Sequence, residues 1–352
     1  MNRVIKQAKG FLLGGLAPAL RNYNASVTEH DGRRWMAYRH EPQAGELCQI
    51  RMAELDDAWR VHRDELITIP HSTGDNLEDP RLFLFRGGLW LAWTAAQYGP
   101  KGWACRQHYG RLERTGEGWH VVQAFAPRFG KNDGKAKEKN WQFFEHGGRL
   151  FAQYEPHHVI EIEGDIVRRQ WRSRPLPWRW GRPSGGTPPV PFSPGKLITF
   201  FHAYEHDATY QRRYNMAALV FEDRPPFRHL AVSAVPLVVA SENDRLPDDG
   251  WRPLCVFPCG AFRKPSGAWV VSLGINDMDV GVVSFRPHEL HLTEPNARPK
   301  LVGDTARVRV LRPILAGGNI VVPPAVVDIP RRSAETLIAR RSVIPIPTYT
   351  LV

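Results

Sequence analysis

The chain has 352 residues, of which 42% are hydrophobic and 24% charged, a composition typical of a soluble globular protein that can bury a sizeable core. No apolar run reaches the ~18–20 residues that a membrane span needs, so no transmembrane helix is predicted. The formal net charge of +11 favours an anionic partner, such as a phosphate, a nucleotide-sugar, an acidic polysaccharide, a nucleic acid or a membrane surface.

The first 20 residues combine a basic start with a short apolar stretch, which gives them a faint likeness to a signal peptide. Glycines interrupt this stretch and a strand pattern follows at once, so we expect residues 1–20 to be an N-terminal extension of a cytoplasmic protein. The four cysteines fit that compartment. Only Cys255 and Cys259 are close in sequence, and no second Cys or His pair completes a zinc site. We therefore expect reduced thiols and no metal ion.

One β-hairpin pattern then recurs along the chain. In each copy a glycine turn opens a nearly continuous apolar strand, as expected for a strand that is buried on both faces. The five copies are Asp31–Arg39, Arg86–Thr94, His146–Tyr154, Pro194–His202 and Pro265–Leu273. A partner strand precedes each copy, at Asn24–His30, Asp79–Phe85, Asn140–His146, Thr187–Phe192 and Cys259–Arg263.

A third strand follows each hairpin, and weaker fourth strands follow some of them, for instance at Glu65–Ile69 and His120–Phe125. Five copies of a four-stranded unit, spaced by roughly 50–70 residues, predict an all-β fold, a five-bladed β-propeller over residues 21–290. The alternative is a β-sandwich with a small second domain. Residues 291–352 are expected to form a C-terminal extension that packs on the propeller or closes it, with strand-like pieces at 306–311, 319–327 and 342–346.

In a propeller the innermost strands begin around a central channel and the second strands end on the same face, so these residues share a funnel. Polar residues collect at the five entrances and are typical of a binding site. The predicted funnel residues are Asn24, Glu78, Asp79, Lys139, Asn140, Gly186, Thr187, Pro258 and Cys259, with Arg39, Thr94, Glu155, His202 and Gly274–Asp277 at the ends of the second strands. The stretch 168–195, rich in Arg, Pro, Trp and Gly, is expected to be a long ordered loop overhanging the funnel.

The run Asn76-Leu-Glu-Asp-Pro-Arg81 supplies the candidate chemical centre. Pro80 biases Asp79 toward an extended conformation, which holds the carboxylate at a rigid strand entrance. Glu78 and Arg81 flank it with one negative and one positive charge, an arrangement that sets the pKa of a carboxyl group. The alternative is a charged turn with a structural ion pair.

Further short motifs lie at the funnel ends of the blades, in this order: Lys139-Asn140-Trp141, Glu155-Pro156-His157-His158, Gly185-Gly186-Thr187-Pro188-Pro189, Phe201-His202 and Asn276-Asp277. With Glu78-Asp79-Pro80-Arg81, this ordered series resembles glycoside hydrolase family 130, the mannoside phosphorylases and their relatives, over about residues 20–285. The resemblance implies a five-bladed propeller that acts on β-mannosides.

The resemblance also implies roles. Asp79 would be the general acid, which protonates the glycosidic oxygen through a hydroxyl of the sugar. The predicted sugar-binding residues are Asn24, Ser26, Glu78, Arg81, His157, Thr187, Asn276 and Asp277. The predicted phosphate-binding residues are Arg39, Lys139, Asn140 and His202. Lys139 stands where an arginine is common, which keeps the charge but loses the bidentate geometry of a guanidinium group.

Three functions remain open at this stage. The first is inverting single displacement on β-mannoside-type linkages, by phosphorolysis or its reverse, because phosphate needs no general base. An inverting hydrolase would need a second carboxylate, for which Glu155 is the candidate. The second is a glycosyltransferase that uses a nucleotide-sugar, and the third is a non-catalytic sugar-binding propeller. No cofactor is expected beyond phosphate or a nucleotide-sugar as co-substrate, and no nucleic-acid partner, while peripheral membrane association and homo-oligomer formation stay open.

Overall fold

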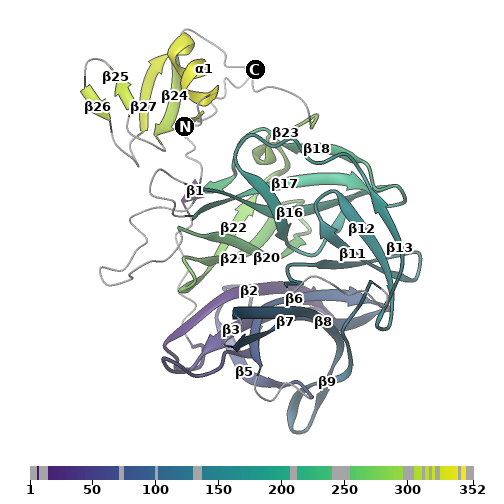
Figure 1. Ribbon diagram of the computed structural model, residues 1–352. Coiled ribbons are helices and arrows are strands. Elements are labelled where there is room, and N and C mark those ends of the chain that lie inside the picture. The colour runs from purple at the N-terminus through teal and green to yellow at the C-terminus, as the bar shows by residue number, and fades with distance from the viewer. Residues whose placement is uncertain are drawn as a thin grey trace.

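The computed structural model describes residues 6–7, 15–70, 75–99, 102–129, 137–206, 212–239, 254–295, 305–310, 314–316, 319–321, 326–339 and 342–345. Its main body is a five-bladed β-propeller (Figure 1). The apolar strands that follow the glycine turns are buried almost throughout, as the strand Trp269–Ile275 illustrates. Residues 1–5 and 8–14, with most of the predicted signal-like stretch, lie outside the described residues.

The blades follow one another along the chain. Blade one consists of β2 (Arg21–His30), β3 (Arg33–Glu41), β4 (Gln49–Leu55) and β5 (Val61–Thr68). Blade two consists of β6 (Asn76–Phe85), β7 (Gly88–Gly99), β8 (Gly102–Thr115) and β9 (Gly118–Phe125). Blade three consists of β10 (Gln142–His146), β11 (Arg149–Glu155), β12 (His158–Glu163) and β13 (Ile166–Arg172). Blade four has β14 (Arg182–Gly186), β15 (Val190–Ser193), β16 (Lys196–His206), β17 (Arg212–Glu222) and β18 (His229–Ser233). Blade five has β20 (Val256–Arg263), β21 (Trp269–Ile275) and β22 (Asp279–Phe285).

Strand pairing also connects parts of the propeller that are separate in sequence. The outer strands β5 and β9 pair in parallel, which joins blades one and two into one eight-stranded sheet. Blade four receives strands from both ends of the propeller sequence: β1 (Lys6–Gln7) pairs with β19 (Val238–Val239), and β23 (Leu292–Thr293) pairs with β18. Because β19 pairs with β17, the N-terminal segment and the segment after blade five are both attached to blade four.

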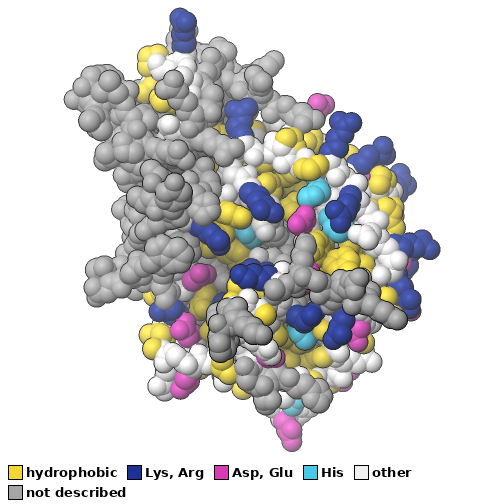
Figure 2. Space-filling view, viewed as in Figure 1, with side chains coloured by type: hydrophobic (Ala, Val, Ile, Leu, Met, Phe, Trp, Pro, Cys, Tyr) yellow, Lys and Arg dark blue, Asp and Glu magenta, His cyan; other side chains and the backbone are white. Residues whose placement is uncertain are grey.

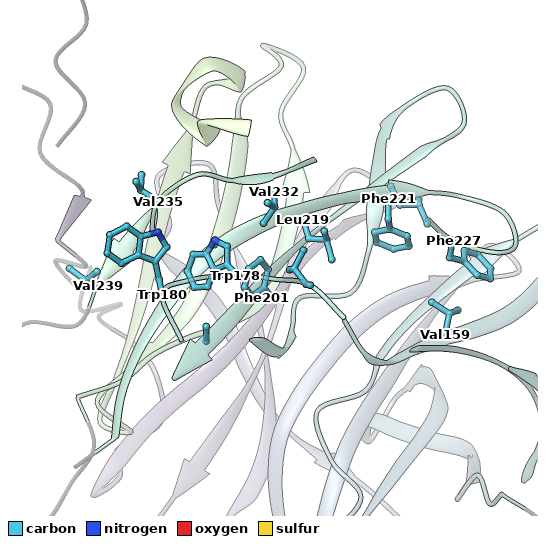
Figure 3. Close-up of a cluster of buried hydrophobic side chains, with 14 of the residues drawn as sticks. Val159, Trp178, Trp180, Phe201, Leu219, Phe221, Phe227, Val232, Val235 and Val239 are labelled. Atoms are coloured by element: carbon cyan, nitrogen blue, oxygen red, sulfur yellow. The ribbon is translucent and has the colours of Figure 1, made fainter. Parts of the chain in front are cut away.

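Large aromatic side chains fill the space between blades. The cluster in Figure 3 brings Trp178 next to Phe201, with ring centroids 5.1 Å apart, and Trp180 next to Val235 and Val239. Between blades one and two, Trp35 and Trp119 meet edge to face at 5.0 Å. Such contacts stabilise neighbouring sheets beyond the burial of apolar area alone.

The stretch 168–195 corrects the sequence prediction in part. It is not one long loop, because residues 166–172 form the outer strand of blade three and residues 182–186 begin blade four. The loop is limited to residues 173–181. Its Trp178 and Trp180 donate their indole N–H groups to Ser233 O and Ala234 O, at 2.8 and 3.0 Å, so the loop is fixed to blade four.

The C-terminal part forms a small separate sheet of β24 (Thr305–Val310), β27 (Val326–Pro330) and β28 (Val343–Pro345), with the hairpin β25 (Ile314–Ala316) and β26 (Asn319–Val321). The sequence analysis did not predict α1 (Arg331–Ala339), a helix that contributes the buried Ala334. Ile329 and Ala334 share a buried cluster with Val235 and Val239 of the propeller. Within the described residues, no helix has the length and apolar character that crossing a membrane requires.

Candidate active site

The inner strands are irregular where they enter the funnel. In blades one, two and four, two residues of the inner strand stand opposite one residue of the second strand, which makes a β-bulge. The pairs are Asn24-Ala25 opposite Tyr38, Asp79-Pro80 opposite Trp93, and Ser184-Gly185 opposite His202. Asn24 and Asp79 have φ of 50°, and Asn140, just before β10, has φ of 64°. The prediction that Pro80 keeps Asp79 extended is therefore wrong. Asn and Asp tolerate this left-handed conformation best, and the bulge re-aims the side chains of Asn24 and Asp79.

Asp79 lies at the centre of the site. It is only 7% exposed, and its Oδ1 accepts a hydrogen bond from Nδ2 of Asn24 at 2.8 Å. Burial alone would raise the pKa of Asp79, but the charges of Lys139, Arg81 and Arg39 together with the Asn24 hydrogen bond hold it below its usual value. Asp79 is therefore a carboxylate at neutral pH in the ligand-free protein.

The cations around Asp79 are held by neighbouring groups. Arg39 donates from Nη2 to Oε1 of Glu78 at 3.1 Å and lies over the Tyr23 ring at 4.8 Å. The ammonium group of Lys139 lies 4.6 Å from the centroid of the Trp103 ring. Cation–π contacts of this kind position a charge without neutralising it, so Lys139 keeps its full charge toward Asp79.

A cavity of about 790 Å³ opens beside this group, over blades three and four. Figure 2 shows a hollow on this face, where His and hydrophobic side chains are surrounded by Lys and Arg. The cavity is lined by Lys137, Glu138, Lys139, Asn140, Tyr154, Glu155, Pro156, His157, Pro175, Leu176, Arg182, Pro183, Ser184, His202, Tyr204, Arg212, Tyr214 and Phe257. Pro175 and Leu176 belong to the loop 173–181, so this loop does form part of the cavity wall.

His202 is a buried, neutral group on the cavity wall. Its ring lies 4.6 Å from that of Phe257 and 5.5 Å from that of Tyr214. Burial, followed by the positive charge of Arg81, lowers the pKa of His202 to about 3. Its Nδ1 has no hydrogen-bond partner among the described residues. It can thus offer a ligand one N–H group or one lone pair, but no charge.

Neither a family model nor any curated protein matches this sequence. Solved structures do match. One, from a study of β-1,2-mannosidic glycoside hydrolases within the GH130 family of mannoside phosphorylases, has a TM-score of 0.59 at 16% identity and covers 77% of this chain and 86% of that chain. The protein has the GH130 fold.

Two further structures share this fold. The β-1,2-mannobiose phosphorylase from Listeria innocua has a TM-score of 0.52 at 14% identity, covering 77% of this chain and 91% of that chain. MPT-1, a GDP-Man-dependent mannosyltransferase from Leishmania mexicana, has a TM-score of 0.51 at 15% identity, covering 83% of this chain and 94% of that chain. Phosphorolysis and nucleotide-sugar transfer thus both occur among the proteins to which this chain is similar.

Several predicted sugar-binding residues of this GH130 fold make hydrogen bonds to the backbone. The Ser26 hydroxyl accepts from Leu82 N at 2.9 Å, and that of Thr187 accepts from Phe200 N at 3.0 Å. Arg81 donates to Gly186 O, Asp79 O and Pro80 O at 2.8, 3.0 and 3.0 Å. The Asn276 amide oxygen accepts from Cys255 N at 2.8 Å. These four residues support the walls of the funnel, and their predicted contact with sugar remains a prediction.

The other predicted residues lie around the funnel and cavity. Glu78 is buried and accepts from Asn76 at 2.7 Å as well as from Arg39. His157 and Glu155 line the cavity and face each other, with 3.5 Å between Nε2 and Oε2. Burial raises the pKa of Tyr23 and of Tyr214, and the Asp277 carboxylate adds to both shifts, so Asp277 lies near both rings.

The sequence analysis missed most of the aromatic side chains of the site. Phe257 contacts His202 and lies 5.0 Å from the guanidinium of Arg81, while Trp103 holds Lys139. It also missed the outer cations Arg182 and Arg212. Phe257 directly precedes the predicted strand entrance of blade five, and this position is the signal that could have revealed it.

Proposed function

We propose that this protein acts on β-mannoside-type linkages by inverting single displacement, and that the reaction is phosphorolysis or its reverse, synthesis. One observation carries the proposal: the buried carboxylate of Asp79 faces the cations Lys139 and Arg39 beside a cavity that is large enough for a sugar and an anion. An anionic nucleophile suits this arrangement, because the cations attract it and it needs no general base.

In the proposed reaction Asp79 supplies the proton. The protonated carboxyl group gives its proton to the glycosidic oxygen, by way of a sugar hydroxyl, as the bond from that oxygen to the anomeric carbon breaks. An oxygen of phosphate attacks the anomeric carbon from the opposite face. The products are a sugar 1-phosphate of inverted configuration and the shortened sugar, which carries the proton. Asn24 orients the carboxyl group through its 2.8 Å contact.

Hydrolysis is supported less well. An inverting hydrolase needs a second carboxylate that activates water, roughly 6.5–9.5 Å from the acid. Glu155 lines the cavity, but its Oε2 lies 3.5 Å from Nε2 of His157. The imidazole would compete with a water molecule for this oxygen, whereas a general base has to hold the water.

A nucleotide-sugar transferase is the second candidate, because the cavity is far larger than a phosphate ion requires. Lys137, Arg182 and Arg212 form an outer set of cations beyond Lys139. Such a set would suit the diphosphate of an activated donor. The likeness to MPT-1 adds to this candidate, although at 15% identity it concerns the fold alone.

The test uses short β-linked manno-oligosaccharides with and without phosphate. Phosphate-dependent release of a sugar 1-phosphate supports phosphorolysis, whereas equal turnover without phosphate would refute it. Glycan extension from a nucleotide-sugar would establish the second candidate. Asp79→Asn should lower kcat by roughly 10²–10⁴-fold in either case. Asp31→Asn is the matched control, because exposed Asp31 has the same left-handed backbone, with φ of 51°.

A binding protein without turnover is the third possibility. It would bind sugar equally well before and after Asp79→Asn and would turn over neither type of donor. The buried and oriented carboxylate argues against it, since holding a charge below the surface costs free energy that sugar binding alone does not require.

A further inference from the structure

The environment of Asp79 contains a conflict. A general acid must carry a proton, yet three cations hold this carboxylate ionised in the ligand-free protein. They come from different parts of the fold: Arg39 from β3, Arg81 from β6, and Lys139 from the segment before β10. The ionised carboxylate of Asp79, together with that of Glu78 on Arg39, compensates their charge.

The same region contains polar atoms that have no hydrogen-bond partner among the described residues. Nε of Arg39, Nη2 of Arg81 and Nδ1 of His202 are buried without a hydrogen-bond partner among the described residues. Buried polar groups normally have partners, so such a cluster is typical of a place where a ligand binds. Two of these three groups are cationic, and a ligand that fits them is an anion.

We propose that anion binding and protonation of Asp79 are coupled: an anion that binds beside Lys139 compensates the surrounding cations, and Asp79 then takes up one proton. The coupling rests on the proposed function. It adds a reason why Asp79 would carry its proton only when the anionic nucleophile is bound. A water molecule in place of the anion would not compensate the cations. The proton donor would then be missing, which would suppress hydrolysis.

Other titratable groups surround Asp79, and each bears on where the proton goes. Tyr23, Cys105, Cys255 and Cys259 are neutral, because burial raises the pKa of each above its usual value. Glu78 is held between Arg39 and Asn76, and the carboxylate of Asp277 lies near Tyr23 and Tyr214, whose pKa values it raises. His202 is the main competitor, since an anion beside a neutral imidazole also favours its protonation.

The coupling can be measured by titration calorimetry of the full chain with sulfate. Sulfate has the shape and charge of phosphate but exchanges no proton near neutral pH. Binding is measured at one pH in two buffers of different ionisation enthalpy, at constant ionic strength. We expect the wild type to take up nearly one proton per sulfate and its Kd to rise by up to about tenfold per pH unit between about pH 6 and about pH 8. Asp79→Asn should bind sulfate with no proton uptake and a constant Kd, while the control Asp31→Asn behaves as wild type.

Three outcomes would overturn the inference in distinguishable ways. Sulfate binding without proton uptake would refute the coupling but leave the proposed function standing. Proton uptake that persists in Asp79→Asn and disappears in His202→Gln would show that the imidazole of His202 takes up the proton instead of Asp79. No binding at all, or equal binding in Lys139→Met, would refute the anion site and with it the proposed phosphorolysis.

Discussion

The sequence and the structure suggest different roles for Arg81. The motif predicts a sugar contact, but the side chain is only 1% exposed. Its guanidinium donates to Gly186 O on blade four and to Asp79 O and Pro80 O on blade two, and it lies 5.0 Å from the Phe257 ring on blade five. Arg81 therefore links three blades across the propeller axis.

Arg81→Met removes these contacts while keeping much of the side-chain volume. Hydrogen bonds to a charged group contribute about 1.5–3 kcal/mol each, and the three carbonyl groups left behind would be buried and less well satisfied. Since such losses are not additive, we expect the free energy of unfolding to fall by about 3–5 kcal/mol. That is a large part of the roughly 5–15 kcal/mol that stabilises a typical domain.

Urea unfolding followed by tryptophan fluorescence measures this loss, with Arg263→Met as the matched control. Arg263 also donates to two carbonyls, those of Phe192 and Gly267, and lies 5.4 Å from the Trp269 ring, but it is exposed. Its loss should cost less than about 1 kcal/mol. If Arg81→Met does not fold, Arg81→Lys keeps the charge and tests the geometry alone. A stability loss for Arg81→Met no larger than that of the control, with binding of sugar lost, would refute the structural role.

Three further predictions concern the anion site and its walls. Lys139→Met should raise the Kd for phosphate by roughly 10–100-fold, because it removes a charge-assisted contact. The control Lys137→Met removes a more exposed charge from the same Trp ring and should change the Kd by less than about threefold, a difference that calorimetry would show. Gly185→Ala should abolish stable folding or phosphate binding, since the added Cβ would collide with Asn140 O and the side chain of Gln142. In the control Gly88→Ala the nearest atom to the added Cβ is 3.7 Å away, so this variant should melt close to the wild-type temperature. The imidazole of His202 should show no titration by NMR between about pH 5 and about pH 8 in the ligand-free protein, because its pKa is about 3; a midpoint inside that range would contradict its burial among cations.

The five blades could be predicted because their signal is local. A glycine turn followed by a buried apolar strand is contained in about ten residues. Five copies of this pattern along the chain predict a ring of five blades. The interrupted inner strand of blade four was not predictable in the same way. There the chain forms β14, leaves the sheet at residues 187–189 and returns as β15, so two short pieces pair with one long strand.

The fourth strand of blade three was missed for another reason. Its residues from Arg168 onward, with Arg169 and Arg172, begin the stretch whose content of Arg, Pro, Trp and Gly predicts a loop. In the structure the strand is the outer edge of its sheet, where charged side chains prevent pairing with another molecule. The arginines therefore mark a protected edge and not an irregular segment.

The repeat predicts which residues stand at the funnel, but not what each of them does there. Asn24 and Asp79 could be placed near one another in advance, because both stand at strand entrances that the repeat brings together, and they are hydrogen-bonded. Nothing near Ser26 in the sequence indicates that its hydroxyl accepts from Leu82 N, which is 56 residues away. The contact between Arg81 and Gly186 spans 105 residues. Polar residues at equivalent positions thus divide into those that face the ligand and those that join blades, and only the three-dimensional structure separates the two groups.

Irregularities at the strand entrances explain why polar side chains lie together on one side of a ring that is nearly symmetric. Blades one and two carry Asn24 and Asp79, with left-handed backbones, in bulges at their entrances, and the two side chains meet in a hydrogen bond of 2.8 Å; Asn140, also left-handed, stands just before the inner strand of blade three. The equivalent bulge in blade four contains Gly185, which has no side chain and instead lets the backbone of Asn140 approach. The space that a side chain would occupy there is filled by Asn140 O and the side chain of Gln142, while the neighbouring Ser184 lines the cavity over blades three and four. One repeated irregularity therefore has two effects: in blades one and two it brings Asn24 and Asp79 together, and in blade four its glycine lets Asn140, a residue of the cavity wall, lie against the inner strand.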